Sequence, residues 1–171
     1  MRIEEWNLLH EMVAESAGHL FTSLGLVNTY AGTIPLSQAS WAPTLSIIGL
    51  GGKLRGSVVL SVPRALLARS HPTGGTVDDD LGDWLAELTN LTLGGIKSQL
   101  LTRGIRTELS TPVMVSATAF RFERFCGAPF VHAFTVGDDT IYVVFEAVAE
   151  VGIAFGPTKQ PSLSPGEMVT F

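Results

Sequence analysis

Glu87 and Asn90 are the two residues whose types and spacing best suit chemistry on a partner molecule. Side chains three residues apart lie on the same side of an α-helix, so this carboxylate and carboxamide would point in one direction. Gly94, one turn later, would leave the backbone bare beside them. A surface with these three features is suited to docking against another macromolecule.

The helix that would carry this pair has an apolar side and a polar side. At about 100° per residue, the apolar side holds Trp84, Leu85, Leu88, Leu91, Ile96 and Leu100. The polar side holds Asp83, Glu87, Asn90, Gly94 and Lys97. We therefore predict that this side of the helix contacts a partner, with Asp83, Gly94 and Lys97 as partner-binding residues beside Glu87 and Asn90. Asp83 alternatively serves only to stabilise the start of the helix.

The alternative for the pair itself is a helix side that is merely solvated. The same spacing of glutamate and asparagine also occurs at Glu4 and Asn7, to which we assign no function. The four histidines and the single cysteine, Cys126, lack the spacing of metal ligands, so packing is their expected role. In the glycine-rich stretch 49–56, Lys53 is followed by leucine instead of the serine or threonine of a phosphate-binding loop. We expect a turn there, and no cofactor or metal bound by this chain.

Composition narrows the classes of protein further. The chain has 171 residues, of which 46% are apolar and 16% charged, and its net charge is −5. This suits one well-filled domain and lacks the basic surface of a nucleic-acid binder. No apolar stretch approaches the roughly 18 residues of a membrane span, and Glu4, Glu5 and Glu11 interrupt the region where a signal peptide would be apolar. We expect a soluble, cytoplasmic protein.

Two long helices organise the chain, and their sequences match at an offset of 76 residues. Leu9, Glu11, Met12, Gly18, Leu20 and Leu24 fall on Leu85, Glu87, Leu88, Gly94, Ile96 and Leu100. Because glycine inside a helix costs about 1 kcal/mol relative to alanine, the matched glycines indicate close backbone approach where the helices cross. At this offset Ala14 occupies the position of Asn90, which indicates a site in the second half alone.

Local patterns predict the other elements. Helices are expected at 3–24, 63–70 and about 81–102, the last after three aspartates and before Gly104, and residues 30–43 are expected to be irregular. Strands are expected at 45–50, 57–62, 105–110, 113–122, 130–136 and 140–149. The fold class is therefore α+β: two related half-domains, with two long helices packed on a mainly antiparallel sheet. We expect one domain over 1–154 and a loosely held tail over 155–171.

The stretch 83–97 (DWLAELTNLTLGGIK) resembles the signature helix of the CheC/CheX family of chemotaxis phosphatases. The family pattern is Asp or Ser, three residues, Glu, two residues, Asn, and a Pro after about 22 more. Asp83, Glu87 and Asn90 match, and Pro112 comes about one residue early. The hairpin at 48–62 (IGLGGKLRGSVVLSV) is also similar to a pair of family strands, and one surviving site looks more like CheX than two-site CheC.

The resemblance implies a phosphatase that removes the aspartyl phosphate from a CheY-type response regulator. Asn90 would position the attacking water, Glu87 would pair with the receiver's active-site lysine, and Mg²⁺ would be held by the receiver. The resemblance also implies a homodimer. The alternative is a non-catalytic interaction module that binds a response regulator or a flagellar-switch or signalling partner. A structural domain without a role in chemotaxis is a third possibility.

Overall fold

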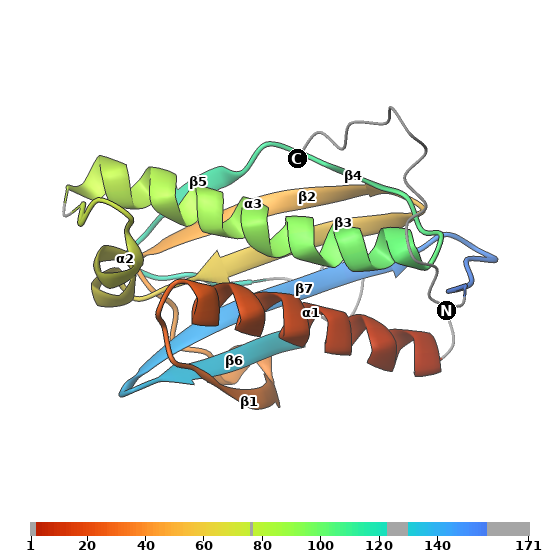
Figure 1. Ribbon diagram of the computed structural model, residues 1–171, viewed down its shortest axis with the longest axis horizontal. Coiled ribbons are helices and arrows are strands. Elements are labelled where there is room, and N and C mark those ends of the chain that lie inside the picture. Colours follow the sequence, from red (N-terminus) through yellow and green to blue (C-terminus); the bar gives the residue numbers. More distant parts are fainter. Residues whose placement is uncertain (1–2, 76, 123–129, 157–171) are drawn as a thin grey trace.

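The computed structural model describes residues 3–75, 77–122 and 130–156, in which one sheet is covered by helices on one face (Figure 1). The order of its strands is β1-β6-β7-β3-β2-β4, β5 also pairs with β2, and all pairs are antiparallel. The predicted α+β class with an antiparallel sheet is confirmed. The strands are β1 (Thr29–Ile34), β2 (Thr44–Gly52), β3 (Leu54–Ser61), β4 (Thr107–Leu109), β5 (Val113–Ser116), β6 (Phe130–Val136) and β7 (Asp139–Ala149).

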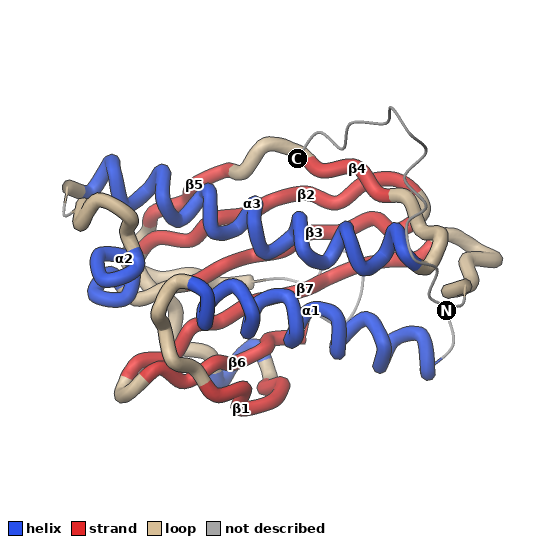
Figure 2. The backbone as a smooth tube through the Cα atoms, in the orientation of Figure 1, coloured by secondary structure: helices blue, strands red, loops and turns tan. Residues whose placement is uncertain are grey.

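Two long helices, α1 (Ile3–Ser23) and α3 (Asp78–Thr102), run side by side in opposite directions over the sheet (Figure 2). The short helix α2 (Arg64–Ser70) lies beside the start of α3, and a 3₁₀ turn, η1 (Leu36–Gln38), follows β1. Helix α3 begins three residues earlier than predicted. The three aspartates predicted to precede it therefore form its first turn, where carboxylates oppose the positive end of the helix dipole.

Four predictions about the strands and their connections need correction. The segment 30–43, predicted as irregular, contains β1, which forms because it pairs with β6 and not because of its own weak alternation. The connection predicted at 51–56 is mostly strand, and only Lys53 separates β2 from β3. The strand predicted at 113–122 ends at Ser116, and that at 105–110 spans only 107–109.

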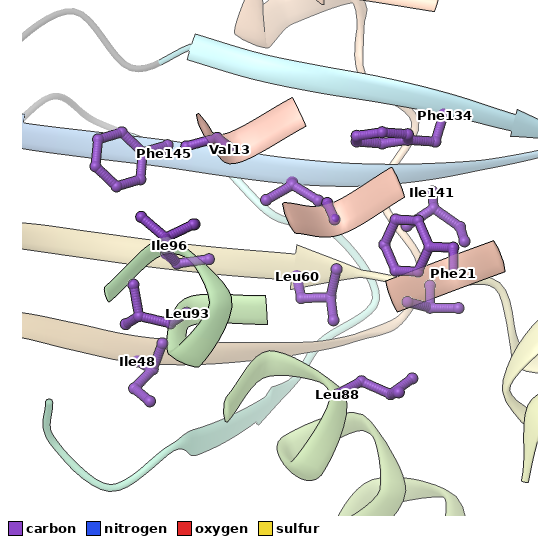
Figure 3. Packing of buried hydrophobic residues seen from close by; sticks show 14 of the residues in the cluster. Val13, Phe21, Ile48, Leu60, Leu88, Leu93, Ile96, Phe134, Ile141 and Phe145 are labelled. Atoms are coloured by element: carbon purple, nitrogen blue, oxygen red, sulfur yellow. The ribbon is translucent and has the colours of Figure 1, made fainter. Parts of the chain in front are cut away.

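The main core lies between the helices and the sheet. Figure 3 shows side chains of α1 and α3 directed at those of β2, β3, β6 and β7. All the side chains labelled there are fully buried: Val13, Phe21, Ile48, Leu60, Leu88, Leu93, Ile96, Phe134, Ile141 and Phe145. This burial is the main force that holds the helices on the sheet.

The two half-domains exchange strands. The first half contributes α1 and β1–β3, and the second contributes α3 and β4–β7. β1 pairs with β6 of the second half, while β4 and β5 pair with β2 of the first half. The hairpins β2–β3 and β6–β7 meet along the central β3–β7 pair. Neither half therefore holds a complete antiparallel set of its own.

The two helices approach most closely at Gly95, which the sequence did not single out. A Cβ atom added to Gly95 would lie 3.1 Å from Cβ of Ser16. The matched glycines do not make this contact: Gly18 faces Phe134, and a Cβ on Gly94 would meet no described atom within 4 Å. The predicted close approach exists, but it is one residue from the predicted position and on another side of the helix.

The ends of the helices show that the structural repeat has an offset of 79 residues. Gly25 and Gly104 both have positive φ, 74° and 79°, and each follows its helix. The N–H of Leu26 donates to the carbonyl of Phe21 at 3.0 Å, and Ile105 donates to Leu100 at 3.0 Å. Both bonds belong to Schellman motifs. The offset of 76 predicted from the sequence is therefore wrong by almost one helical turn, a shift that preserves much of the apolar pattern.

The helix crossing can be tested with one substitution at two neighbouring positions. Gly95→Leu is expected to lower the free energy of unfolding by about 1–3 kcal/mol because the new side chain must displace α1. Gly94→Leu meets open space and replaces a poor helix former, so stability should stay the same or rise. Urea unfolding measures both. Equal destabilisation by the two variants would contradict the crossing at Gly95.

A buried polar chain links α1 to the sheet. His132 on β6 is fully buried, and its Nε2 lies 3.1 Å from Nδ1 of His10. Its other ring nitrogen lies 2.9 Å from the hydroxyl of Tyr30 on β1. Burial and the nearby charge of His10 lower the pKa of His132 to about 3, and burial lowers the pKa of His10. His132 is therefore neutral in the folded protein at neutral pH.

This pKa shift predicts loss of stability in mild acid. The unfolded chain takes up a proton at His132 below about pH 6.5, whereas the folded chain does so only near pH 3. The unfolded state thus binds more protons between these values, and the free energy of unfolding should fall by about 1.4 kcal/mol per pH unit as pH decreases. Urea unfolding between pH 7 and pH 5 should show a shallower dependence for His132→Gln. An identical dependence would refute the assignment.

Candidate functional site

The polar side of α3 faces solvent as predicted. Asp83, Glu87, Asn90 and Lys97 are exposed and Gly94 is partly exposed. Their spacings of three and four residues place them along one line of the helix. The buried residues of α3, which include Leu85, Leu88, Ile96 and Leu100, lie on the other side.

One residue of the predicted apolar side lies away from the core, and another packs against it only in part. Leu91 is 43% exposed, so it flanks the polar line instead of entering the core. Trp84 is partly buried, and its indole N–H donates to the hydroxyl of Ser70 at 3.0 Å. This bond joins α2 to α3. Trp84 therefore helps to hold the start of the site helix in place.

The side chains of Glu87 and Asn90 have no hydrogen bond or ion pair within the part of the chain that the structure describes. Beneath them the helix packs on the core through Leu88 and Leu93. The hydroxyl groups of Thr89 and Thr92 are buried and donate to helix carbonyls at 2.8 Å. Gln99 also donates to the hydroxyl of Ser16 on α1 at 3.1 Å. The pair is thus presented on a fixed support with its polar atoms available to a partner.

The first helix lacks an equivalent pair. At the structural offset of 79, Leu8 of α1 corresponds to Glu87 and Glu11 corresponds to Asn90. The sequence offset had instead placed Glu11 and Ala14 there. Under either offset no asparagine stands opposite Asn90, so α1 does not repeat the pair.

Two hollows meet beside Asp83. A groove of about 610 Å³ lies between α2, the start of α3 and β5, and its lining includes Asp83, Gly82 and Met114. A second hollow of about 350 Å³ is lined by His71, Thr73, Asp80, Asp83 and Trp84. Asp83 therefore belongs to both hollows as well as to the polar line of α3. No local sequence pattern indicates the groove, because its lining comes from four separate segments: 42–44, 62–67, 78–85 and 114–116.

The remaining candidate ligands do not assemble into a cluster in the described part of the chain. No group of three or more His, Cys, Asp or Glu residues is arranged to hold a metal there. His71 stacks edge-on against Trp84, and His10 pairs with His132. Cys126 lies outside the described residues. The stretch 49–56 is strand except at Lys53, so the turn expected there is much shorter than predicted. It leads from β2 into β3, whereas a phosphate-binding loop leads from a strand into a helix.

The amino-acid sequence matches a model of a known protein family. Residues 44–133, more than half of the chain, match the family described as chemotaxis phosphatase CheX. This match includes α3 with Glu87 and Asn90. The chain belongs to the CheX family. The resemblance seen in the sequence is thereby confirmed at the level of the family.

Solved structures of the CheX family share the fold. CheX from Vibrio vulnificus superposes with a TM-score of 0.70 at 19% identity, covering 80% of this chain and 96% of that one. CheX from Desulfovibrio desulfuricans gives 0.71 at 13% identity, covering 82% and 99%. In the CheX–CheY–BeF3–Mg²⁺ complex from Borrelia burgdorferi, the matching chain gives 0.64 at 15% identity, covering 80% and 96%. No curated protein matches the sequence.

Two observations concern the rest of the molecule. Among the described helices, none is long and apolar enough to cross a membrane. Of the tail predicted over 155–171, Phe155 packs against the core and the N–H of Gly156 donates to the carbonyl of Arg103 at 3.1 Å. Residues 157–171 lie outside the described residues.

The exposure of the pair predicts that it can be altered without harm to the fold. Asn90→Ala and Glu87→Ala remove atoms that contact solvent, and alanine is the better helix former. Each variant should keep its free energy of unfolding within about 0.5 kcal/mol of the wild type, or slightly above it. Thermal and urea unfolding measure this. A loss of 2 kcal/mol or more would place these side chains in the structural support of the helix.

Proposed function

We propose that this protein hydrolyses the aspartyl phosphate of a phosphorylated CheY-type response regulator. The observation that carries the proposal is the exposed pair Glu87 and Asn90 on a helix packed against the core, in a chain that belongs to the chemotaxis phosphatase CheX family. The reaction needs a water molecule placed in line with the phosphorus atom. Phosphoryl transfer depends mainly on such positioning and on electrostatic stabilisation.

Asn90 would place the water. Its carboxamide can accept a hydrogen bond from the water while its N–H₂ donates to an oxygen nearby. The water oxygen then bonds to phosphorus as the bond from phosphorus to the aspartyl oxygen breaks. The products are inorganic phosphate, which carries the oxygen and both protons of the water, and the regenerated carboxylate of the receiver. A neutral amide suits this role because a carboxylate would repel the phosphoryl oxygens.

Glu87 would fix the register of the complex. It lies one turn before Asn90 and has no ion-pair partner in the described part of the chain. The resemblance implies the receiver's active-site lysine as its partner, and such a pair would also shield the water from bulk solvent. Asp83, Gly94 and Lys97 would extend the contact along the helix. The receiver's own carboxylates would hold the Mg²⁺ that neutralises the phosphoryl group.

The decisive experiment follows the decay of a phosphorylated CheY-type receiver from the same organism. Wild-type protein should accelerate decay well above the receiver's own rate, and Asn90→Ala should reduce kcat by about 100-fold or more. Glu87→Ala should raise KM, because it weakens docking. The stability of each variant serves as its control. If the wild type binds the receiver without accelerating decay, the protein is an interaction module and not a phosphatase.

The proposal extends to the location of the protein in the cell and to its oligomeric state. A CheY-type substrate would place the protein in the cytoplasm. The homodimer implied by the resemblance remains a prediction, and light scattering on the purified protein would measure it.

A further inference from the structure

We propose that the groove between α2, the start of α3 and β5 is a second docking site for the receiver. It would take a segment that carries an apolar side chain next to a lysine or arginine. The inference rests on the proposed function, because it assigns a further contact to the same partner. Figure 1 shows the three elements side by side at one end of the molecule. The groove has a volume of about 610 Å³.

The floor of the groove is apolar. Val62, Leu67 and Leu85 line it, and each is almost fully buried in the free protein. Met114 of β5 adds a flexible and adaptable wall, a type of side chain that suits contact with a partner. An apolar side chain inserted here would leave water for a site that is already largely formed. The floor therefore specifies the apolar part of the occupant.

The rim of the groove is acidic. Asp78, Asp79 and Asp83 face one basic residue, Arg64, and Arg64 forms an ion pair with Asp78. Asp79 and Asp83 have no ion pair within the described residues. Two carboxylates thus remain to attract a cation at the edge of an apolar hollow. This charge arrangement favours a basic segment and disfavours an acidic one.

The groove is continuous with the candidate site. Asp83 lines the groove and also lies on the polar line that contains Glu87 and Asn90. At 1.5 Å per residue, Gly82 lies about 12 Å along the helix from Asn90. A receiver that places its phosphoryl group at Asn90 can therefore reach the groove with a neighbouring segment. Contacts at this distance from the reacting atoms would strengthen binding without changing the chemical step.

The walls of the groove come from both halves of the molecule, and the described residues form no second groove of this kind at the corresponding place. Its wall α2 follows β3 of the first half, and in the described residues no helix follows β7 at the corresponding place in the second half. The two long helices thus differ both in the catalytic pair and in the groove. Both features lie on α3, where a single partner can use them together.

Gly82 offers a direct test. A Cβ atom added there would meet no described atom within 4 Å, although the residue lines the groove. Gly82→Trp should fill the groove without disturbing the core, and Gly82→Ala, which also improves helix propensity, should leave it open. With phosphorylated receiver, Gly82→Trp should raise KM about tenfold at unchanged kcat, whereas Gly82→Ala should match the wild type.

A second pair of variants tests the charge. Asp79→Asn removes a rim carboxylate, while Asp80→Asn makes the same change in the same turn outside the groove. Asp79→Asn should raise KM at low salt by about threefold and weaken its dependence on ionic strength, and Asp80→Asn should do so less. Equal effects of the two variants would remove the assigned role of the rim.

The outcomes separate this inference from the proposed function. If Asn90→Ala abolishes turnover while Gly82→Trp leaves KM unchanged, the groove is not a receiver site although the phosphatase assignment stands. If the wild type shows no turnover, binding of the receiver loaded with beryllofluoride and Mg²⁺ tests the groove alone, and Gly82→Trp should still weaken it about tenfold. If Gly82→Trp instead disrupts a homodimer and leaves receiver binding intact, the occupant is a second copy of this chain and the inference is overturned.

Discussion

The burial of one side of α3 against the sheet determines what the other side presents. Leu85, Leu88, Ile96 and Leu100 are fully buried, and they leave the helix no freedom to turn about its axis. Because the helical period is fixed, Glu87 and Asn90 must then face solvent. The contacts of Gln99 with Ser16 and of Trp84 with Ser70 fix the helix to α1 and α2. A water-positioning side chain needs such a support, since small displacements from productive geometry are costly.

Periodicity was sufficient to predict this helix from the sequence, because both of its sides are long and distinct. It was insufficient for β1, whose residues alternate weakly and become a strand only because β6 lies beside them. The β2–β3 turn was misplaced for a related reason. Gly56 looked like a turn residue, yet a side chain there would lie 1.8 Å from the carbonyl oxygen of Glu146. That constraint comes from β7, which is distant in sequence.

Local patterns also misplaced the offset between the two halves of the chain. Apolar positions match at 76 residues because a shift of three preserves much of a helical pattern, whereas the backbone bonds that end the helices match at 79. The groove beside Asp83 had no local signal either, since α2, α3 and β5 supply its walls. Local pattern thus predicted the candidate catalytic pair. The surfaces around the pair depend on contacts between segments that are distant in the chain. Local sequence patterns do not predict which of these segments come together.

Gly94 and Gly95 are adjacent in α3 but have different surroundings. Gly95 points toward α1, where a side chain would crowd Ser16, so its lack of a Cβ permits the helices to pack. A Cβ atom on Gly94 would instead meet no described atom within 4 Å. Packing therefore gives no reason for the glycine at 94, although a glycine there weakens the helix. A partner whose backbone approaches closely beside Asn90 would supply that reason, and this argument is independent of the charges along the rest of the face.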